Sequence, residues 1–254
     1  MLRRLGFFTF VLSAFLIFPV LGLYLRLVVT PLTWIRRAWG VVLLNPLVRF
    51  WGVTLFGLGK LLDGGQVQVT GFAPEKAKPY LVLSNHQSII DIALLFWVFR
   101  KTHIKFVMKK ELQWGIPNVS PATRLARFAF LDRRAGLHLA EATLKPLCDA
   151  LNEEKVGCVI FPEGTRSRDG KLRSFKSAGV ALMARELHWD VLVVTLDGTW
   201  QAATPMDLYR HLPGFRFKIH IEPPQPMGPF REDPKAALEG VRAVMERRIQ
   251  EFRK

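Results

Sequence analysis

The residues best suited to acid–base chemistry lie in one short stretch, Leu81 to Asp91. His86 and Asp91 stand close together in this stretch. A neutral histidine that a carboxylate orients can act as a general base for a hydroxyl group. On one unbroken helix the two side chains would point apart, because a helix advances about 3.6 residues per turn. They can meet only if His86 precedes a helix and Asp91 lies in its first turn.

The flanking residues predict that arrangement. Tyr80 to Leu83 predicts a strand and Ile92 to Val98 predicts a helix. Ser88 is a natural N-cap, which puts Asp91 at the third helical position. The same pattern is typical of a capping box, in which Asp91 only satisfies backbone N–H groups and His86 is an ordinary loop residue. Both interpretations can hold at once.

The composition favours a membrane surface over nucleic acid as a partner. The chain has 254 residues, a formal net charge of +15 and 50% hydrophobic residues, with a mean hydropathy of +0.17. Such a charge suits nucleic acid, anionic lipid or an acidic carrier protein. The basic residues are scattered, however, without a zinc-finger spacing, an RNP-type motif or a basic zipper. The cysteines, Cys148 and Cys158, lack a CxxC spacing, and we expect both to be reduced and buried.

Residues 1–60 predict a membrane anchor that precedes a separate domain, residues 61–254. Leu5 to Leu25 carries no charge, and its length can span a hydrocarbon core. A second apolar stretch is interrupted by Arg36 and Arg37. One interpretation is a spanning helix followed by an interfacial helix. The other, which the arginines favour, is a helical hairpin that dips into one leaflet and keeps its arginines at the headgroups.

Residues 61–254 predict an α/β fold, with a mixed, mostly parallel sheet flanked by helices. Ligand sites of such sheets gather at the carboxyl ends of the strands. His86, Lys109, Asp132-Arg133 and the loop Pro162–Ser167 each follow a predicted strand, so we expect all four at one edge. The predicted strands are 66–70, 80–83, 104–108, 128–131, 158–161, 191–196 and 215–221, and the predicted helices are 92–98, 137–154, 177–188 and one that begins at Pro234 after an Asp233 cap.

Four segments resemble the motifs of the glycerolipid acyltransferases. Asn85–Asp91 resembles their NHxxxxD motif, and Phe161–Ser167 resembles their FPEGTRS motif. Phe130–Arg133 and Lys109–Leu112 resemble the two segments between these motifs. One HxxxxD is weak, but the two main motifs in this order form a strong joint signal. The most similar group is the PlsC-like 1-acylglycerol-3-phosphate acyltransferases, and one departure is Arg127, which stands where a glycine often begins the second motif.

The resemblance implies that an acyl group moves from a thioester to the free sn-2 hydroxyl of 1-acylglycerol 3-phosphate, giving phosphatidic acid. The thioester is already activated, so the resemblance implies no metal, no cofactor and no covalent enzyme intermediate. Acyl-CoA or an acyl carrier protein would be the co-substrate. His86 would take the hydroxyl proton, and Asp91 would fix its tautomer and stabilise the imidazolium. A positioned base of this kind contributes roughly 100- to 10,000-fold in rate.

The acceptor phosphate implies cationic ligands. Arg166 is the first candidate, because a guanidinium can bind phosphate oxygens in bidentate fashion. Arg133 and Lys109 are further candidates. In the same loop, Glu163 would accept a hydrogen bond from a glycerol hydroxyl or hold Arg166. The remaining substrate-binding candidates are Gly164, which allows close backbone approach, and Thr165.

The lysolipid would come from the bilayer, so we expect the enzyme on the inner or plasma membrane with its catalytic domain on the cytoplasmic face. The sequence leaves two alternatives open. One is an acyltransferase for another lysophospholipid with a larger headgroup. The other is a non-catalytic membrane protein that binds lipid, although a binding protein needs no base. The oligomeric state cannot be inferred from the sequence.

Overall fold

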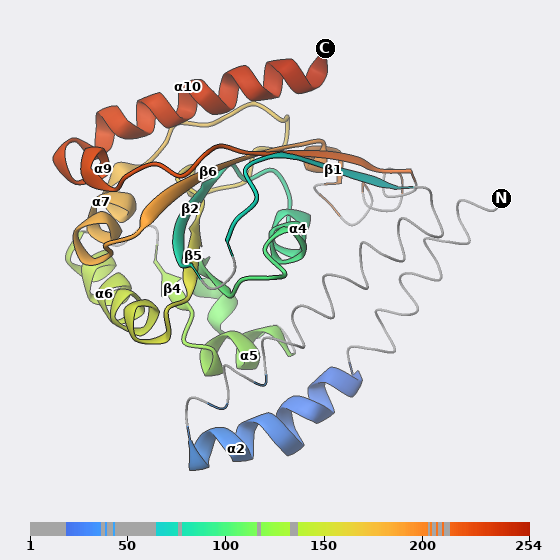
Figure 1. Cartoon of the computed structure of the whole chain (residues 1–254). Coiled ribbons are helices and arrows are strands. Elements are labelled where there is room, and N and C mark those ends of the chain that lie inside the picture. The colour runs from blue at the N-terminus through green and yellow to red at the C-terminus, as the bar shows by residue number, and fades with distance from the viewer. Residues whose placement is uncertain are drawn as a thin grey trace.

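A mixed seven-stranded sheet with helices on both faces organises the described part of the molecule (Figure 1). The computed structural model describes residues 19–36, 39, 43, 65–75, 78–115, 118–132, 137–202, 204, 207, 210 and 214–254. In chain order the strands are β1 (Gln66–Gly71), β2 (Tyr80–Ser84), β3 (Ile104–Lys109), β4 (Ala129–Leu131), β5 (Gly157–Ile160), β6 (Asp190–Asp197) and β7 (Arg216–Ile221).

The sheet is mostly parallel, as the sequence predicts. Its spatial order is β1-β7-β6-β2-β5-β3-β4. Among the seven described strands, β6 and β7 are the one neighbouring pair that is antiparallel, and the other neighbouring pairs are parallel. Strands β2 to β6 therefore run in one direction and their carboxyl ends share one edge. That edge receives the residues that follow each of these strands, which is the expected place for a site.

The helices lie on both faces of the sheet. Their bounds are η1 (Leu25–Val29), α2 (Thr30–Ile35), α4 (Ile90–Val98), η2 (Lys110–Gln113), α5 (Val119–Leu125), α6 (Leu137–Glu154), α7 (Ser177–Glu186), η3 (Thr199–Ala202), α9 (Gly228–Glu232) and α10 (Pro234–Arg253). Figure 1 shows α6, α7, α9 and α10 on one face and α4 on the other.

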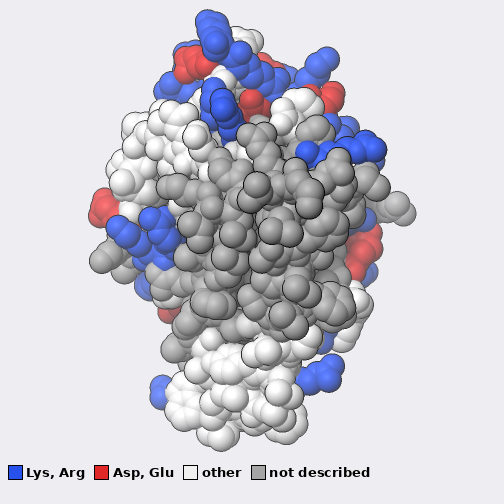
Figure 2. Space-filling model, turned by 90° about the vertical axis from the view of Figure 1, so that its right-hand side faces the viewer, with Lys and Arg blue, Asp and Glu red and all other residues white. Residues whose placement is uncertain are grey.

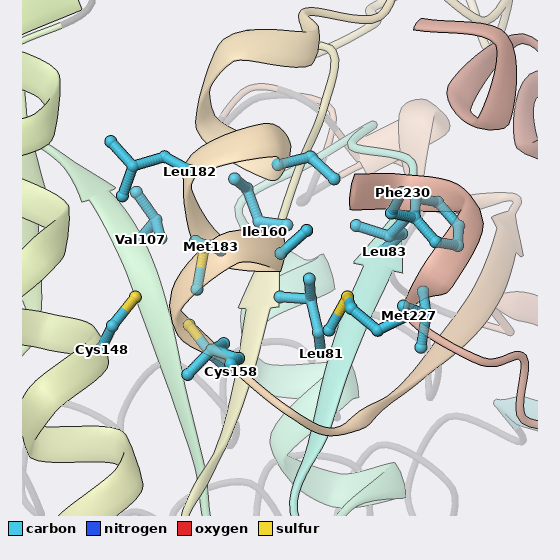
Figure 3. Packing of buried hydrophobic residues seen from close by; sticks show 14 of the residues in the cluster. Leu81, Leu83, Val107, Cys148, Cys158, Ile160, Leu182, Met183, Met227 and Phe230 are labelled. Atoms are coloured by element: carbon cyan, nitrogen blue, oxygen red, sulfur yellow. The ribbon is translucent and has the colours of Figure 1, made fainter. Parts of the chain in front are cut away.

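Alternating side chains of the central strands supply two separate hydrophobic cores. Leu81 and Leu83 of β2 face the first core, together with α6, α7 and α10. Tyr80 and Val82 face the second core, together with α4. Successive side chains of a strand point to opposite faces, and a central parallel strand is covered on both, which explains the continuous apolar run of β2. Figure 3 shows the first core from close by.

Both cysteines lie in the first core, as predicted. Cys148 of α6 and Cys158 of β5 are free and fully buried. Their sulfur atoms lie among the packed apolar side chains of Figure 3. Burial disfavours the thiolate, so it raises the pKa of Cys148 to about 12 and also raises the pKa of Cys158.

One segment that the sequence predicts as a loop, Trp114–Pro121, is partly helical. Helix α5 begins at Val119, after Asn118 with a φ of 64°. Asparagine tolerates this left-handed conformation better than most residues, so it can start the helix abruptly after a turn. The prediction missed α5 because its few residues and its proline, Pro121, carry little helical signal.

The predicted anchor, residues 1–60, falls largely outside the described residues. Its described residues, 19–36 with 39 and 43, include η1 and α2, and Leu25 and Val29 pack there against Ala126 beside α5. Gly22 lies so close to Asn118 that a Cβ would stand 2.5 Å from its side-chain oxygen. Among the helices of the described residues, none combines the length and apolar character needed to cross a membrane.

Candidate active site

The turn after β2 brings His86 and Asp91 together. The chain leaves β2 at Ser84, and α4 begins at Ile90, so His86 lies before the helix and Asp91 lies in its first turn. The Nδ1 of His86 lies 2.8 Å from Oδ2 of Asp91. Asp91 is fully buried, and the His86 side chain is 11% exposed. The pair is therefore nearly dry, and only a small part of the imidazole reaches the surface.

The carboxylate of Asp91 also holds the backbone of this turn. Its Oδ2 accepts hydrogen bonds from the backbone N–H of Gln87 at 2.6 Å and of Ser88 at 2.8 Å. One carboxylate therefore holds both the backbone of the turn and the imidazole of His86. The predicted cap is wrong in detail, because Ile89 is the N-cap and makes no side-chain cap bond. Ser88 donates its hydroxyl to the carbonyl of Ala202 at 2.6 Å, and its Oγ accepts only a long hydrogen bond, 3.4 Å, from the N–H of Ile90.

The loop after β5 begins with a tight turn that its residue types dictate. The N–H of Gly164 donates to the carbonyl of Phe161 at 3.0 Å, which closes a four-residue turn with Pro162 at its second position. Proline favours that position of a turn. Gly164 has a φ of 65°, in the left-handed region where glycine carries no steric cost. A Cβ there would approach only the flexible side chain of Lys176, so backbone conformation rather than crowding requires the glycine.

Glu163 joins this loop to the His86 turn. Its Oε1 accepts the backbone N–H of His86 at 2.8 Å, and its Oε2 accepts the N–H of Arg173 at 2.9 Å. The N–H of Ser167 donates to the carbonyl of His86 at 2.7 Å, which closes the connection from the other side. Burial of Glu163 raises its pKa, and the two backbone N–H groups oppose the rise. Glu163 is only 2% exposed and makes no bond to Arg166, so its contacts fit a positioning role.

An aromatic ring supports one face of the imidazole. The rings of His86 and Phe161 are stacked, with centroids 4.1 Å apart and planes inclined by 14°. Phe161 in turn lies 6.1 Å from Phe106 of β3. Together with the bond from Nδ1 to Asp91, this stacking fixes the plane of the imidazole.

The cationic candidates differ in their contacts. Arg166 is half-buried, and among the described residues it has no hydrogen-bond or ion-pair partner; the neighbouring Thr165 is exposed. Lys109 lies at the end of β3 and pairs with Glu111 at 2.8 Å on an exposed surface. Arg133 lies outside the described residues. Among the described residues, no group of three or more His, Cys, Asp or Glu side chains could hold a metal ion.

Two residues of the turn, Asn85 and Gln87, were not singled out from the sequence. The side chain of Asn85 exchanges two hydrogen bonds with the backbone of Leu196, at 2.7 and 2.9 Å, and so continues the pairing of β2 with β6. Gln87 is buried, and its Oε1 accepts from Thr199 at 3.1 Å and from the N–H of Trp200 at 3.3 Å. Their position on either side of His86 was the only signal in the sequence, since amide side chains that become buried there must find hydrogen-bond partners.

Comparisons with known proteins agree with this fold and with the family that the motifs resemble. The sequence model of the family described as Acyltransferase matches residues 66–197. A 1-acyl-sn-glycerol-3-phosphate acyltransferase from Limnanthes douglasii is 31% identical over 211 residues, covering 78% of this chain and 70% of that protein. The 1-acyl-sn-glycerol-3-phosphate acyltransferase alpha of Ovis aries is 28% identical over 186 residues, covering 70% of this chain and 61% of that protein.

The chain therefore belongs to the Acyltransferase family. It is an acyltransferase related to the 1-acyl-sn-glycerol-3-phosphate acyltransferases. Its fold matches the crystal structure of the 1-acyl-sn-glycerophosphate (LPA) acyltransferase PlsC from Thermotoga maritima with a TM-score of 0.67 and 24% identity. That match covers 99% of this chain and 95% of the PlsC chain.

Proposed function

We propose that the protein transfers a fatty acyl group from an acyl thioester to the sn-2 hydroxyl of 1-acylglycerol 3-phosphate, with His86 as the general base. The observation that carries the proposal is the buried His86–Asp91 pair, 2.8 Å apart, at the shared edge of the parallel strands. The names of the relatives support the choice of acceptor. The product would be phosphatidic acid.

The pairing with Asp91 favours the tautomer that the reaction needs. An ionised carboxylate only accepts hydrogen bonds, so the proton of neutral His86 lies on Nδ1. The lone pair is then on Nε2, which has no hydrogen-bond partner among the described residues. A hydroxyl that reaches Nε2 can give up its proton as its oxygen attacks the thioester carbonyl carbon. The imidazolium that forms is stabilised by Asp91, which remains ionised.

The second half of the reaction returns His86 to its starting state. When the tetrahedral intermediate collapses, the carbon–sulfur bond breaks and the thiolate leaves. The imidazolium proton passes to the thiolate, which becomes the free thiol, and the acyl group stays on the lipid oxygen as an ester. No covalent bond to the enzyme is required, since the thioester supplies the activated acyl group.

Arg166 is the best-supported ligand for the acceptor phosphate. It follows Glu163 in the loop that is bonded to the His86 backbone, so a phosphate bound there would lie near the base. Its guanidinium has no partner among the described residues and can offer bidentate hydrogen bonds to phosphate oxygens. Lys109 is a weaker candidate because it already pairs with Glu111. Arg133 remains a candidate from sequence alone.

Exposed apolar side chains support docking on a lipid surface. Trp34 and Ile35 of α2 are 84% and 74% exposed, and Leu27 of η1 is 66% exposed. Ile89 and Trp114, 58% and 65% exposed, lie in segments that follow β2 and β3 at the edge of the site. Large apolar side chains gathered on a water-exposed protein surface are typical of an interaction site. A membrane would supply the lysolipid directly at this edge.

Transfer of labelled oleoyl from its CoA thioester to lysophosphatidic acid tests the proposal. His86→Ala removes the base and Asp91→Asn removes the carboxylate, so each should lower kcat by roughly 100- to 10,000-fold. His138→Ala, at an exposed histidine of α6, is the matched control. Near-full activity of His86→Ala would refute the assigned base. Wild-type transfer only to a lysolipid with a larger headgroup, or only from an acyl carrier protein, would replace the proposed acceptor or donor.

A further inference from the structure

The last residue of α10, Arg253, reaches the edge that carries the site. Its Nε and one of its terminal nitrogens donate to the two carboxylate oxygens of Asp197, at 3.0 and 2.7 Å. This is the bidentate geometry in which a guanidinium and a carboxylate bind most specifically. Asp197 is the last residue of β6, directly beside β2, and it is only 7% exposed. Helix α10 is thus attached to β6, the neighbour of β2, and His86 lies in the turn that follows β2.

Asp197 also binds Gln87, a residue of the turn that contains His86. The amide Nε2 of Gln87 donates to Oδ1 of Asp197 at 3.3 Å, while its Oε1 accepts from Thr199 and Trp200. Gln87 is 1% exposed, so this side chain is held on both of its polar atoms inside the protein. Its backbone N–H donates to Oδ2 of Asp91, and this contact of 2.6 Å is the shortest of the three on that oxygen.

Arg253 also attaches the loop that contains Glu163 and Arg166. The terminal nitrogen that binds Asp197 donates to the carbonyl of Gly170 at 2.9 Å. Gly170 has a φ of 72°, and a Cβ there would lie 2.6 Å from Arg253 and 2.8 Å from the Trp200 ring. Only a glycine fits between these side chains. The Arg253 guanidinium therefore contacts the end of β6 and the loop after β5 directly, and it is linked to the turn after β2 through Asp197.

We infer that Arg253 is a positioning residue for acyl transfer, which acts through Asp197 and Gln87 on the carboxylate that orients His86. The inference rests on the proposed role of His86 as the base. Without Arg253, Asp197 loses its two strongest donors and Gln87 loses a fixed partner. The N–H of Gln87 then holds Asp91 less firmly, and the imidazole spends less time in the reactive orientation. Small misplacements of catalytic groups are costly in rate, even when the change is remote.

The test compares Arg253→Gln and Arg253→Lys with Arg247→Gln in the full-length protein. Arg247 is an exposed residue of the same helix with no ion pair among the described residues, so it controls for loss of charge. We expect Arg253→Gln to lower kcat by about tenfold to a hundredfold, with the KM for lysophosphatidic acid changed less than twofold. Arg253→Lys keeps the charge but loses the bidentate geometry, so its kcat should be intermediate.

A second measurement separates positioning from loss of folded protein. Arg253→Ala leaves a space that free guanidinium can enter, because the Arg253 side chain is 40% exposed. Millimolar guanidinium should then raise kcat of Arg253→Ala several-fold and leave Arg247→Ala unchanged, with each kcat referred to the folded fraction from circular dichroism. An unchanged kcat in Arg253→Gln, or a loss fully explained by unfolding without guanidinium rescue, would overturn the inference. Full activity of His86→Ala would instead overturn the proposed function, so the two failures are distinguishable.

Discussion

At the scale of single residues, the buried Glu163 joins two loops of the candidate site through contacts with their backbones. Its two oxygens accept the backbone N–H groups of His86 and Arg173. Ser167 donates to the His86 carbonyl, so the peptide groups on both sides of the His86 Cα are bonded to the loop after β5. The acid in this loop is needed because only a carboxylate offers two acceptor oxygens to two N–H groups.

Replacement of Glu163 by glutamine tests this role. Glutamine offers one acceptor oxygen, and its NH2 group would face the second N–H. One of the two donors, the buried N–H of His86 or the part-buried N–H of Arg173, then loses its partner, which costs up to about 1–3 kcal/mol. We expect Glu163→Gln to lower kcat by about tenfold or more and to leave the KM for lysophosphatidic acid almost unchanged. Glu239→Gln, at an exposed residue of α10, is the control; a large rise in KM with unchanged kcat would instead indicate direct substrate contact.

The raised pKa of Glu163 predicts a pH dependence of stability. In the unfolded chain a glutamate loses its proton near pH 4.3, whereas burial keeps the proton on Glu163 to higher pH in the folded protein. Between the two values the folded state binds more protons, so stability falls as the pH rises through this interval. The melting temperature of the wild type should therefore fall relative to Glu163→Gln as the pH rises from about 4.3. A difference between the two melting curves that stays constant with pH would contradict this prediction.

The two cysteines should be chemically inert in the folded protein. Only the thiolate is an effective nucleophile, and burial raises the pKa of Cys148 to about 12 and that of Cys158 as well. Iodoacetamide at neutral pH should leave both thiols unmodified by mass spectrometry and activity unchanged. Modification of both should appear after unfolding in guanidinium chloride. Labelling of either cysteine in the native enzyme would mean that the first core opens.

At the scale of secondary-structure elements, the sequence predicts each of the seven described strands but not how all of them pair in the sheet. Local patterns identify β2 as a buried strand and α10 by its Asp233-Pro234 start, and Asp233 does accept the N–H groups of Lys235 and Ala236. The reversed direction of β7 relative to β6 could not be predicted, since strand direction depends on pairing partners far apart in sequence. The same reason applies to the contact from Arg253 to Asp197.

The contacts of the candidate site are also of two kinds, local ones that the sequence predicts and long-range ones that only the structure reveals. His86 and Asp91 could be paired from sequence because both belong to one turn, whose geometry is local. The bonding of Glu163 to the His86 backbone joins two loops that follow neighbouring strands, so only the structure reveals it. The backbone conformation of Arg127 explains why the resembled motif often has a glycine at this position. Arg127 stands where a glycine was expected and adopts a φ of 57°, a conformation in which glycine is favoured.

A buried ion pair connects β3 to the end of α6. The Nζ of Lys105 lies 2.7 Å from Oε2 of Glu154, but neither atom has hydrogen-bond geometry within the described part of the chain. Burial lowers the pKa of Lys105 more than Glu154 raises it. The cost of removing the lysine charge from water is therefore not fully offset, and such pairs often contribute little net stability.

Two substitutions at this pair should differ in their effects. Lys105→Met removes the more deeply buried charge and leaves Glu154, which is 16% exposed and lies 3.4 Å from Arg127, so it should cost less stability than Glu154→Ala. Glu154→Ala leaves the lysine charge buried without its partner and should cost about 3 kcal/mol, or about 6–12 °C in melting temperature for a protein of this size. Glu153→Ala is the matched control, because Glu153 also pairs with Arg127 but is largely exposed. Equal losses for Glu153→Ala and Glu154→Ala would contradict this account.

At the scale of the whole molecule, charged side chains are unevenly distributed on the face shown in Figure 2. On the face shown in Figure 2, Lys and Arg side chains gather at the end that carries α10, whereas the end formed by α2 is mostly uncharged. The uncharged end contains exposed apolar side chains such as Leu27, Trp34 and Ile35. Apolar contact and attraction to anionic lipid are the two contributions that hold a protein on a membrane surface. In the proposed docking on a membrane, α2 would therefore enter the boundary between lipid and water.

Substitution of exposed apolar residues of η1 and α2 tests membrane docking. Leu27, Trp34 and Ile35 do not belong to the contact with α5, which uses Leu25 and Val29, so their replacement by glutamine should leave the fold intact. Burial of such a side chain contributes about 1.5–3 kcal/mol, so a triple variant should partition into anionic vesicles at least about tenfold more weakly. The measurement is sedimentation with vesicles of phosphatidylglycerol and phosphatidylcholine.

Activity with two forms of substrate separates docking from catalysis. The triple variant should need more lysophosphatidic acid for half-maximal rate when the lipid is presented in vesicles, because fewer enzyme molecules reach the surface. With lysophosphatidic acid in detergent micelles kcat should stay unchanged, since the His86 turn is untouched. Leu139→Gln, at an exposed leucine of α6, is the matched control and should bind vesicles like the wild type. If the triple variant sediments as Leu139→Gln does, these side chains of η1 and α2 do not contact the lipid surface.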